Sequence, residues 1–131
     1  MPIFISPLYV DLPRKTKKDK RVMLNLNTYR NLHFIINNQA KVSYKEVMKD
    51  QLEGLKLKTP IKLKFTLWRK DKRVGDRANV LSVIEKFFCD ALVEYGCLAD
   101  DNDEFISGQV YETGGIDRDN PHVEIEIIEH Q

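Results

Sequence analysis

The segment from Asp76 to Asp101, DRANVLSVIEKFFCDALVEYGCLADD, contains a complete set of helix signals. Asp76 is an N-cap residue, and Gly96 suits the left-handed position that follows the last turn of many helices. Apolar residues recur between them at three- and four-residue intervals, as on a helix with one buried face. They are Ala78, Leu81, Ile84, Phe88, Ala91, Leu92 and Tyr95. The pattern predicts one long helix that ends near Tyr95.

On both sides of this helix, apolar and polar residues alternate as they do in strands with one buried face. We expect strands over residues 3–11, 22–26, 61–68, 105–112 and 123–128, and an amphipathic helix over residues 31–52. A turn is expected at Gly114–Gly115. This order of elements predicts an α+β fold, with a small mixed β-sheet and two main helices.

Length and composition favour a single globular domain over residues 1–131. Hydrophobic residues make up 42% of the chain and charged residues 31%, which excludes a fully disordered protein. No apolar run approaches the roughly 18 residues of a membrane-spanning helix, and the first residues lack the basic stretch of a signal peptide. Cys89 and Cys97 would lie about 12 Å apart along a helix, too far for a disulfide. We therefore expect an intracellular, cytoplasmic protein with reduced thiols.

The two halves of the chain have opposite charge. Residues 1–73 contain 18 Lys and Arg against 6 Asp and Glu, a net charge of +12, whereas residues 74–131 contain 3 against 14, a net charge of −11. A basic surface beside a cluster of carboxylates is what a metal-dependent nuclease needs. The alternative is that the two sets of charges neutralise each other on the folded surface.

Two basic runs are candidates for contacts with DNA phosphates, although such runs also occur in solvated loops. The first run lies between the first two predicted strands. The second run follows the predicted strand over residues 61–68, which ends at Trp68, the only tryptophan of the chain. Their members are Arg14, Lys15, Lys17, Lys18 and Lys20 in the first run, and Arg69, Lys70, Lys72 and Arg73 in the second.

Three carboxylates have the chemistry of Mg²⁺ ligands: Asp76 before the long helix, and Asp100 and Asp101 after it. A helix of about 19 residues is about 28 Å long, so its two ends cannot share a metal ion. Either the helix is broken between Asn79 and Lys86, or Asp76 of one chain meets the acidic loop of a second chain in a symmetric dimer. Lys86 either stabilises a phosphate or forms an ordinary ion pair with Asp90.

The same segment resembles the RusA family of Holliday-junction resolvases, in particular the small versions carried by phages and prophages. The family pattern begins with D-x-D-N and continues with a helical Lys four residues before D-A-L. A Gly follows, and an Asp-Asp pair stands four and five residues after that Gly. The chain matches the Lys86, Asp90-Ala91-Leu92, Gly96 and Asp100-Asp101 spacings. The resemblance implies a compact mixed α/β fold, a homodimer, and Mg²⁺-dependent cutting of four-way DNA junctions, with Mn²⁺ as an alternative metal. It implies no nucleotide cofactor, and a bacterial or phage origin.

Carried onto this chain, the resemblance makes Asp76 and one of Asp100 and Asp101 metal ligands, and Lys86 the catalytic lysine. The chain departs from the family in two ways. The second Asp of D-x-D-N is Ala78, and four extra residues separate Asn79 from Asp90 relative to the shortest family members. Candidates for the missing oxygen ligand are Asn79, Asp103 and Glu104.

The sequence is also compatible with two other functions. One is a junction-binding protein that has lost cleavage through the change at Ala78, and the other is a protein-interaction factor that meets its partner through the acidic half. The chain has no Cys or His spacing typical of zinc, and no nucleotide-binding or acyl-transfer motif.

Overall fold

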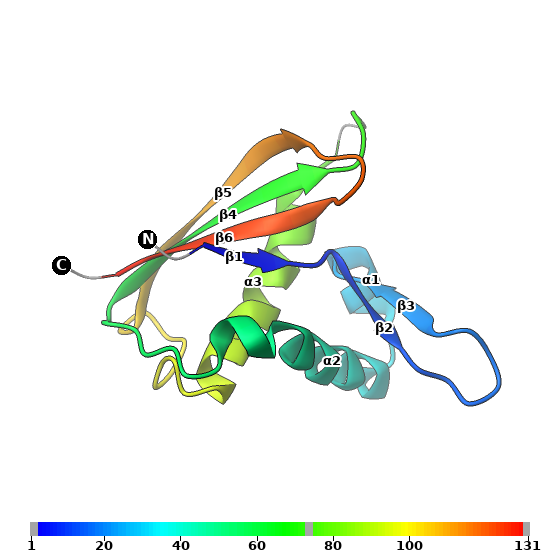
Figure 1. Cartoon of the computed structure of the whole chain (residues 1–131), viewed down its shortest axis with the longest axis horizontal. Helices are drawn as coiled ribbons and strands as arrows, with labels where there is room; N and C mark the ends of the chain where they lie inside the picture. The colour runs from blue at the N-terminus through cyan, green and yellow to red at the C-terminus, as the bar shows by residue number, and fades with distance from the viewer. Residues whose placement is uncertain (1–2, 73–74, 130–131) are drawn as a thin grey trace.

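The structure, a computed structural model, describes residues 3–72 and 75–129. Four strands form a mixed sheet in the order β1 (Ile3–Ser6), β6 (His122–Ile128), β4 (Ile61–Arg69) and β5 (Ile106–Ile116). Strand β6 is antiparallel to both β1 and β4, whereas β4 and β5 are parallel. Parallel neighbours need a crossover connection, and the long helix α3 (Arg77–Glu94) provides it (Figure 1). The expected α+β class and mixed sheet are confirmed.

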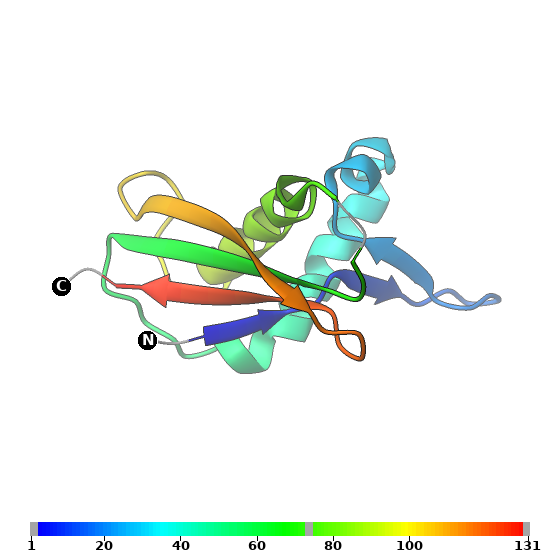
Figure 2. The same ribbon diagram turned by 90° about the horizontal axis from the view of Figure 1, so that it is seen from above.

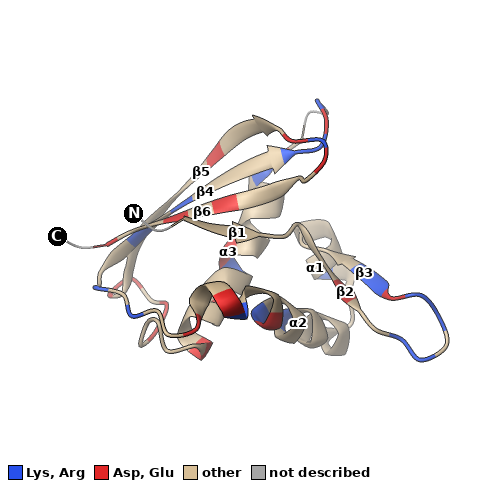
Figure 3. Cartoon of the chain, in the orientation of Figure 1, with Lys and Arg blue, Asp and Glu red and all other residues tan. Residues whose placement is uncertain are grey.

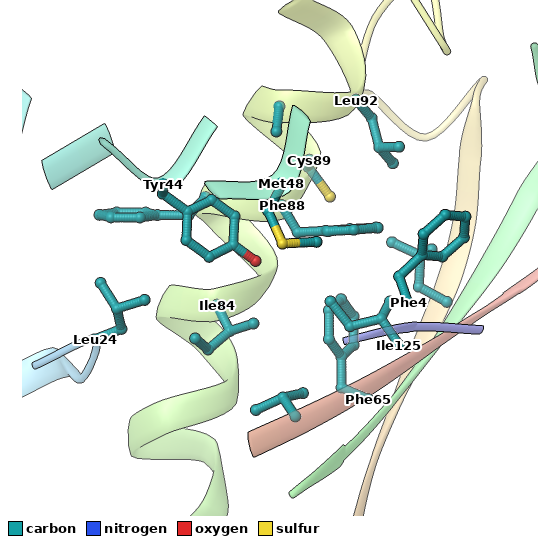
Figure 4. Packing of buried hydrophobic residues seen from close by; sticks show 14 of the residues in the cluster. Phe4, Leu24, Tyr44, Met48, Phe65, Ile84, Phe88, Cys89, Leu92 and Ile125 are labelled. Carbon is teal, nitrogen blue, oxygen red and sulfur yellow. The ribbon is translucent and has the colours of Figure 1, made fainter. Parts of the chain in front are cut away.

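Helix α3 is buried on two sides because it lies between the sheet and helix α2 (Phe34–Leu52) (Figure 4). Phe88 packs against Phe4 of β1 and Phe65 of β4, with ring centroids 6.0 and 6.4 Å apart. The adjacent Phe87 contacts Tyr44 of α2 at 5.7 Å. The core therefore includes both faces of α3, and more of the helix is buried than its single apolar stripe predicted.

The expected first strand is divided at Pro7 into β1 and β2 (Tyr9–Leu12). Proline has no N–H with which to continue a sheet ladder. After it the chain leaves the main sheet, and β2 pairs antiparallel with β3 (Lys20–Met23) in a separate hairpin. Figures 1 and 2 show this hairpin extending away from the body of the molecule.

The expected strand over residues 22–26 ends early because Asn25 caps a short helix, α1 (Leu26–Asn31), by accepting a hydrogen bond from the Thr28 N–H at 2.8 Å. Helix α2 begins at Phe34, after His33 as its N-cap, rather than near residue 31. The fold thus has two long helices and one short helix among its described residues.

The expected turn at Gly114–Gly115 is wrong, because β5 continues through both glycines to Ile116. A Cβ added at Gly114 would lie 2.5 Å from the Trp68 indole of the neighbouring strand, so this glycine accommodates the large ring. The boundaries of α3 were predicted closely. Asp76 is its N-cap, Tyr95 its C-cap, and Gly96 follows with a φ of +72°.

No helix in the described parts of the chain is long and apolar enough to span a membrane. Cys89 and Cys97 are buried free thiols.

Candidate functional site

A polar pocket of about 380 Å³ lies between the middle of α3 and strand β5. The residues that α3 contributes are three or four positions apart and so share one helix face. The loop after α3 and the first half of β5 form the opposite wall. The lining residues are Ser82, Glu85, Lys86, Cys89, Asp101, Asp103, Ile106, Gln109 and Tyr111.

Two of the residues predicted from the sequence, Lys86 and Asp101, line this pocket together. They meet because the chain turns back after α3 and returns beside the helix as β5. Asp103, considered above as an additional oxygen ligand, lines the same pocket, whereas Glu104 and Asn79 do not. A lysine beside several carboxylates is the central feature of the site.

Lys86 lies near an aromatic ring rather than in a local ion pair. Its Nζ is 5.9 Å from the centroid of the Tyr29 ring of α1, at the outer range of a cation–π contact. In the residues that the structure describes, Lys86 forms no ion pair with Asp90. The ammonium group is therefore not neutralised by the i, i+4 partner that the sequence offers.

Glu85 and Tyr111 are the site residues that sequence reasoning missed. The Tyr111 hydroxyl donates a hydrogen bond to Glu85 Oε1. Burial and the Glu85 carboxylate raise the pKa of Tyr111 well above its usual value, so the hydroxyl stays protonated and keeps donating. No local motif signals this pair, because it depends on the pairing that brings β5 beside β4 and α3.

Cys89 is not a nucleophile in this pocket. Burial raises the pKa of its thiol first, and the negative charges of Glu85, Asp101 and Asp90 raise it further. A protonated, buried thiol is chemically inert.

Asp76 does not line the pocket and lies at the N-terminal end of α3. Helix α3 is unbroken over 18 residues, about 27 Å, which excludes the expected break between Asn79 and Lys86. Asp76 Oδ1 accepts a hydrogen bond from the Ala78 N–H at 2.9 Å, as an N-cap does. Among the described residues of one chain, Asp76 belongs to no group of three or more His, Cys, Asp or Glu side chains arranged to hold a metal ion.

Asp100 also does not line the pocket, although it is adjacent to Asp101. Its Oδ1 accepts a hydrogen bond from the Asp101 N–H at 2.7 Å, and its Oδ2 accepts one from Asn102 Nδ2 at 3.3 Å. Its carboxylate accepts hydrogen bonds within the loop, whereas Asp101 lines the pocket.

The donor set has the chemistry of a magnesium site but is incomplete in one chain. Glu85, Asp101 and Asp103 offer the oxygen ligands that Mg²⁺ prefers, and Mg²⁺ keeps several waters and binds substrate phosphates. Over residues 3–72 and 75–129, no group of three or more His, Cys, Asp or Glu side chains is arranged to hold a metal ion. Further ligands would have to come from the substrate, from water or from a second chain.

The basic residues predicted to bind DNA lie in two places, both outside the pocket. Arg14, Lys15, Lys17 and Lys18 are exposed in the loop of the β2–β3 hairpin, with Lys20 at the start of β3. Arg69, Lys70 and Lys72 lie at the end of β4, and Arg73 falls outside the described residues. Figure 3 shows the hairpin loop and the acidic loop after α3 at opposite ends of the molecule.

A scan against protein-family models finds no family that matches the chain, and a search of curated proteins finds no sequence with significant similarity. The polar pocket and the two basic surfaces are the features of the chain that indicate a function.

Proposed function

We propose that the protein is a metal-dependent endonuclease that cuts branched DNA, with four-way junctions as its substrate, and that it acts as a homodimer. The observation that carries this proposal is the polar pocket in which Lys86 lies opposite Asp101 and Asp103. Positive and negative groups gathered at one site suit a reaction in which a phosphodiester is both bound and cut.

Each pocket residue has a role in this proposal. Asp101, with Asp103 or Glu85, holds the cation by its carboxylate oxygens, and Tyr111 keeps the Glu85 carboxylate turned into the pocket. Lys86 donates hydrogen bonds to the scissile phosphate, where negative charge increases as the bond breaks. When bound, Mg²⁺ or Mn²⁺ supplies an activated water and offsets phosphate charge.

The basic hairpin loop and the end of β4 are the proposed DNA-binding surfaces. Both are rich in exposed Lys and Arg, which bind phosphates irrespective of sequence. The hairpin loop lies at the opposite end of the molecule from the acidic loop (Figure 3), so a DNA that contacts both the loop and the pocket has to extend along the protein.

The dimer is part of the proposal because α3 is unbroken. Asp76 does not line the pocket of its own chain, so in this proposal it joins Asp101 from a second chain. A two-fold symmetric dimer would form two such sites, one for each of the paired cuts that resolve a junction.

The test is a gel assay on a labelled four-way junction and a duplex of the same sequence, with Mg²⁺, Mn²⁺ or a chelator. We expect the wild-type protein to cut the junction only with metal, and Asp101→Asn to bind it without cutting. Asp100→Asn is the matched control, because an amide oxygen still accepts the hydrogen bond of the Asp101 N–H, and it should still cut. Intact junctions at every metal concentration would contradict the proposal.

A second candidate, a junction-binding protein without cleavage, is supported by two observations. Ala78 stands where the resemblance expects a carboxylate, and the described residues of one chain contain no three-ligand group. If the wild type binds junctions without cutting and Ala78→Asp cuts them, this candidate holds instead. If neither junction nor duplex binds near physiological salt, the acidic half is left as a surface for a protein partner.

A further inference from the structure

A second pocket, of about 590 Å³, lies at the base of the β2–β3 hairpin and takes no part in the proposed cleavage. Its walls come from the hairpin, the end of β4, the first turn of α3 and the loop before β6. Val80 lines it from α3, and because Lys86 is six residues further on, the two side chains lie on different faces of the helix. The pocket is therefore a separate site.

The walls of this pocket are largely apolar and include an aromatic ring. They are formed by Leu8, Tyr9, Met23, Leu67, Val80 and Pro121. Tyr9 and Met23 are opposite each other in the hairpin and are 37% and 43% exposed. Half-exposed apolar side chains around a concave surface favour a flat, partly apolar ligand.

The Tyr9 ring is held in place by Arg21, which also lines the pocket. The Arg21 guanidinium carbon lies 3.8 Å from the centroid of the ring. Two hydrogen bonds from Arg21 to the Asp11 carboxylate, at 3.0 and 3.2 Å, fix the guanidinium. The side chain that a ligand would stack against is thus already ordered.

Cations surround the opening. Arg69 donates a hydrogen bond to the Gly75 carbonyl at 2.9 Å, which holds its guanidinium beside the pocket, and Lys70 is exposed next to it. The lining also contains the carboxylates of Asp71 and Asp119, so its own charge is only slightly positive. The hairpin loop that extends from the pocket adds Arg14, Lys15, Lys17, Lys18 and Lys20 against Asp19.

We propose that this pocket binds one unpaired nucleotide of the DNA, with its base against Tyr9 and Met23 and its phosphate beside Arg69 and Lys70. Apolar walls and cations are the combination that single-stranded nucleic acid needs, because every base has a face that stacks and every nucleotide a charge. A paired base is already stacked on both faces and cannot enter. The inference rests on the proposed function only in taking DNA as the substrate.

The experiment compares two duplexes of one sequence, one fully paired and one with a single unpaired thymine, by fluorescence anisotropy with chelator present. We expect the unpaired thymine to tighten binding about tenfold, the scale of one stacked base. Met23→Glu should abolish this difference. Val42→Glu, at an apolar residue of α2 that is 57% exposed and outside the pocket, should retain it.

A photocrosslink on the wild-type protein makes the test independent of any variant's folding. With 4-thiothymidine at the unpaired position, we expect crosslinks to Tyr9 or Met23. Equal affinity for the two duplexes, or crosslinks confined to residues outside the pocket, would overturn the inference. If the junction is still cut in that case, the proposed function stands. If the wild type binds no DNA, both fail.

Discussion

The four-stranded sheet and the β2–β3 hairpin carry the charges of this chain in different ways. In the sheet, strands from the basic half lie beside strands from the acidic half, and Lys64 of β4 lies 3.3 Å from Glu112 of β5. In the described part of the hairpin, the ion pair is internal, between Arg21 and Asp11, and the cations of the loop have no acidic partner. The opposite charges of residues 1–73 and 74–131 thus neutralise each other in the sheet, where strands of the two halves are neighbours. The positive charges of the hairpin loop are not neutralised in this way.

The two regions also differ in what they contribute to stability. The packed core includes helix α3, helix α2, the sheet and the buried side chains of Val10, Leu12 and Val22 from the hairpin strands, whereas the hairpin loop is exposed. The difference indicates that the loop of the hairpin contributes little to the stability of the fold.

The largest effect should come from the core. We expect Phe88→Ala to lower the free energy of unfolding by about 3–5 kcal/mol, because it leaves a cavity between α3 and the sheet. Lys17→Ala, in the hairpin loop, should change it by less than about 0.5 kcal/mol. Urea unfolding followed by circular dichroism measures both, and similar losses for the two variants would remove the distinction between body and hairpin.

The second-largest effect should come from Lys86 in the polar pocket. We expect Lys86→Ala to lower the rate of junction cleavage by about 100-fold or more while junction binding is little changed, since the group acts on charge that develops during cleavage. Lys41→Ala is the matched control, because Lys41 Nζ also lies close to the Tyr29 ring, at 5.8 Å, but does not line the pocket. If Lys86→Ala and Lys41→Ala lose cleavage equally in single-turnover kinetics, the loss comes from the shared contact with Tyr29 and not from the pocket.

A smaller effect compares the charges of hairpin and sheet directly. Replacing Lys15 and Lys17 by Ala should reduce the slope of log affinity against log salt concentration by about 2, one for each DNA phosphate that a lysine no longer neutralises. Replacing Lys64 of β4 by Ala should leave the slope nearly unchanged, since Glu112 lies beside Lys64 and β6 places Glu126 opposite it. Binding titrations at several salt concentrations measure both slopes, and equal reductions would mean that the sheet also contacts DNA.

The smallest effect concerns Asp11. Hydrogen bonds from Arg21 lower the pKa of this carboxyl in the folded protein. The ion pair therefore stabilises the fold above the unfolded pKa of about 3.9, and this contribution is lost as pH falls through the lowered value. In an NMR titration, Arg21→Gln should raise the pKa of Asp11 towards its ordinary value. Arg14→Gln should leave it unchanged, because Arg14 bonds to the Lys18 carbonyl.

Features governed by local signals were predictable from the sequence, and those governed by distant pairing were not. The helix from Arg77 to Glu94 has its cap, its period and its terminal glycine in one continuous segment. The first predicted strand is divided because the residues after Pro7 pair with β3 instead of the main sheet. The glycines of β5 are accommodated within a strand because they pack against Trp68 of β4. These relations have no local pattern.

The same division applies to the site. Lys86 and Asp101 were singled out by their residue types and by the family resemblance, and they line one pocket. Glu85 and Tyr111 were missed because their hydrogen bond joins a helix to a strand 26 residues away. Asp76, at the N-terminal end of an unbroken helix, does not line the pocket of its own chain.

A subunit-mixing experiment tests the shared site most directly. Asp76→Asn and Asp101→Asn proteins are assayed separately and after exchange of their subunits, by nicking of a labelled four-way junction with Mg²⁺. If each site takes Asp76 from one chain and Asp101 from the other, each variant alone is inactive, and random mixing restores about a quarter of the wild-type sites. A mixture as inactive as its components, with subunit exchange verified, would contradict a site built between two chains.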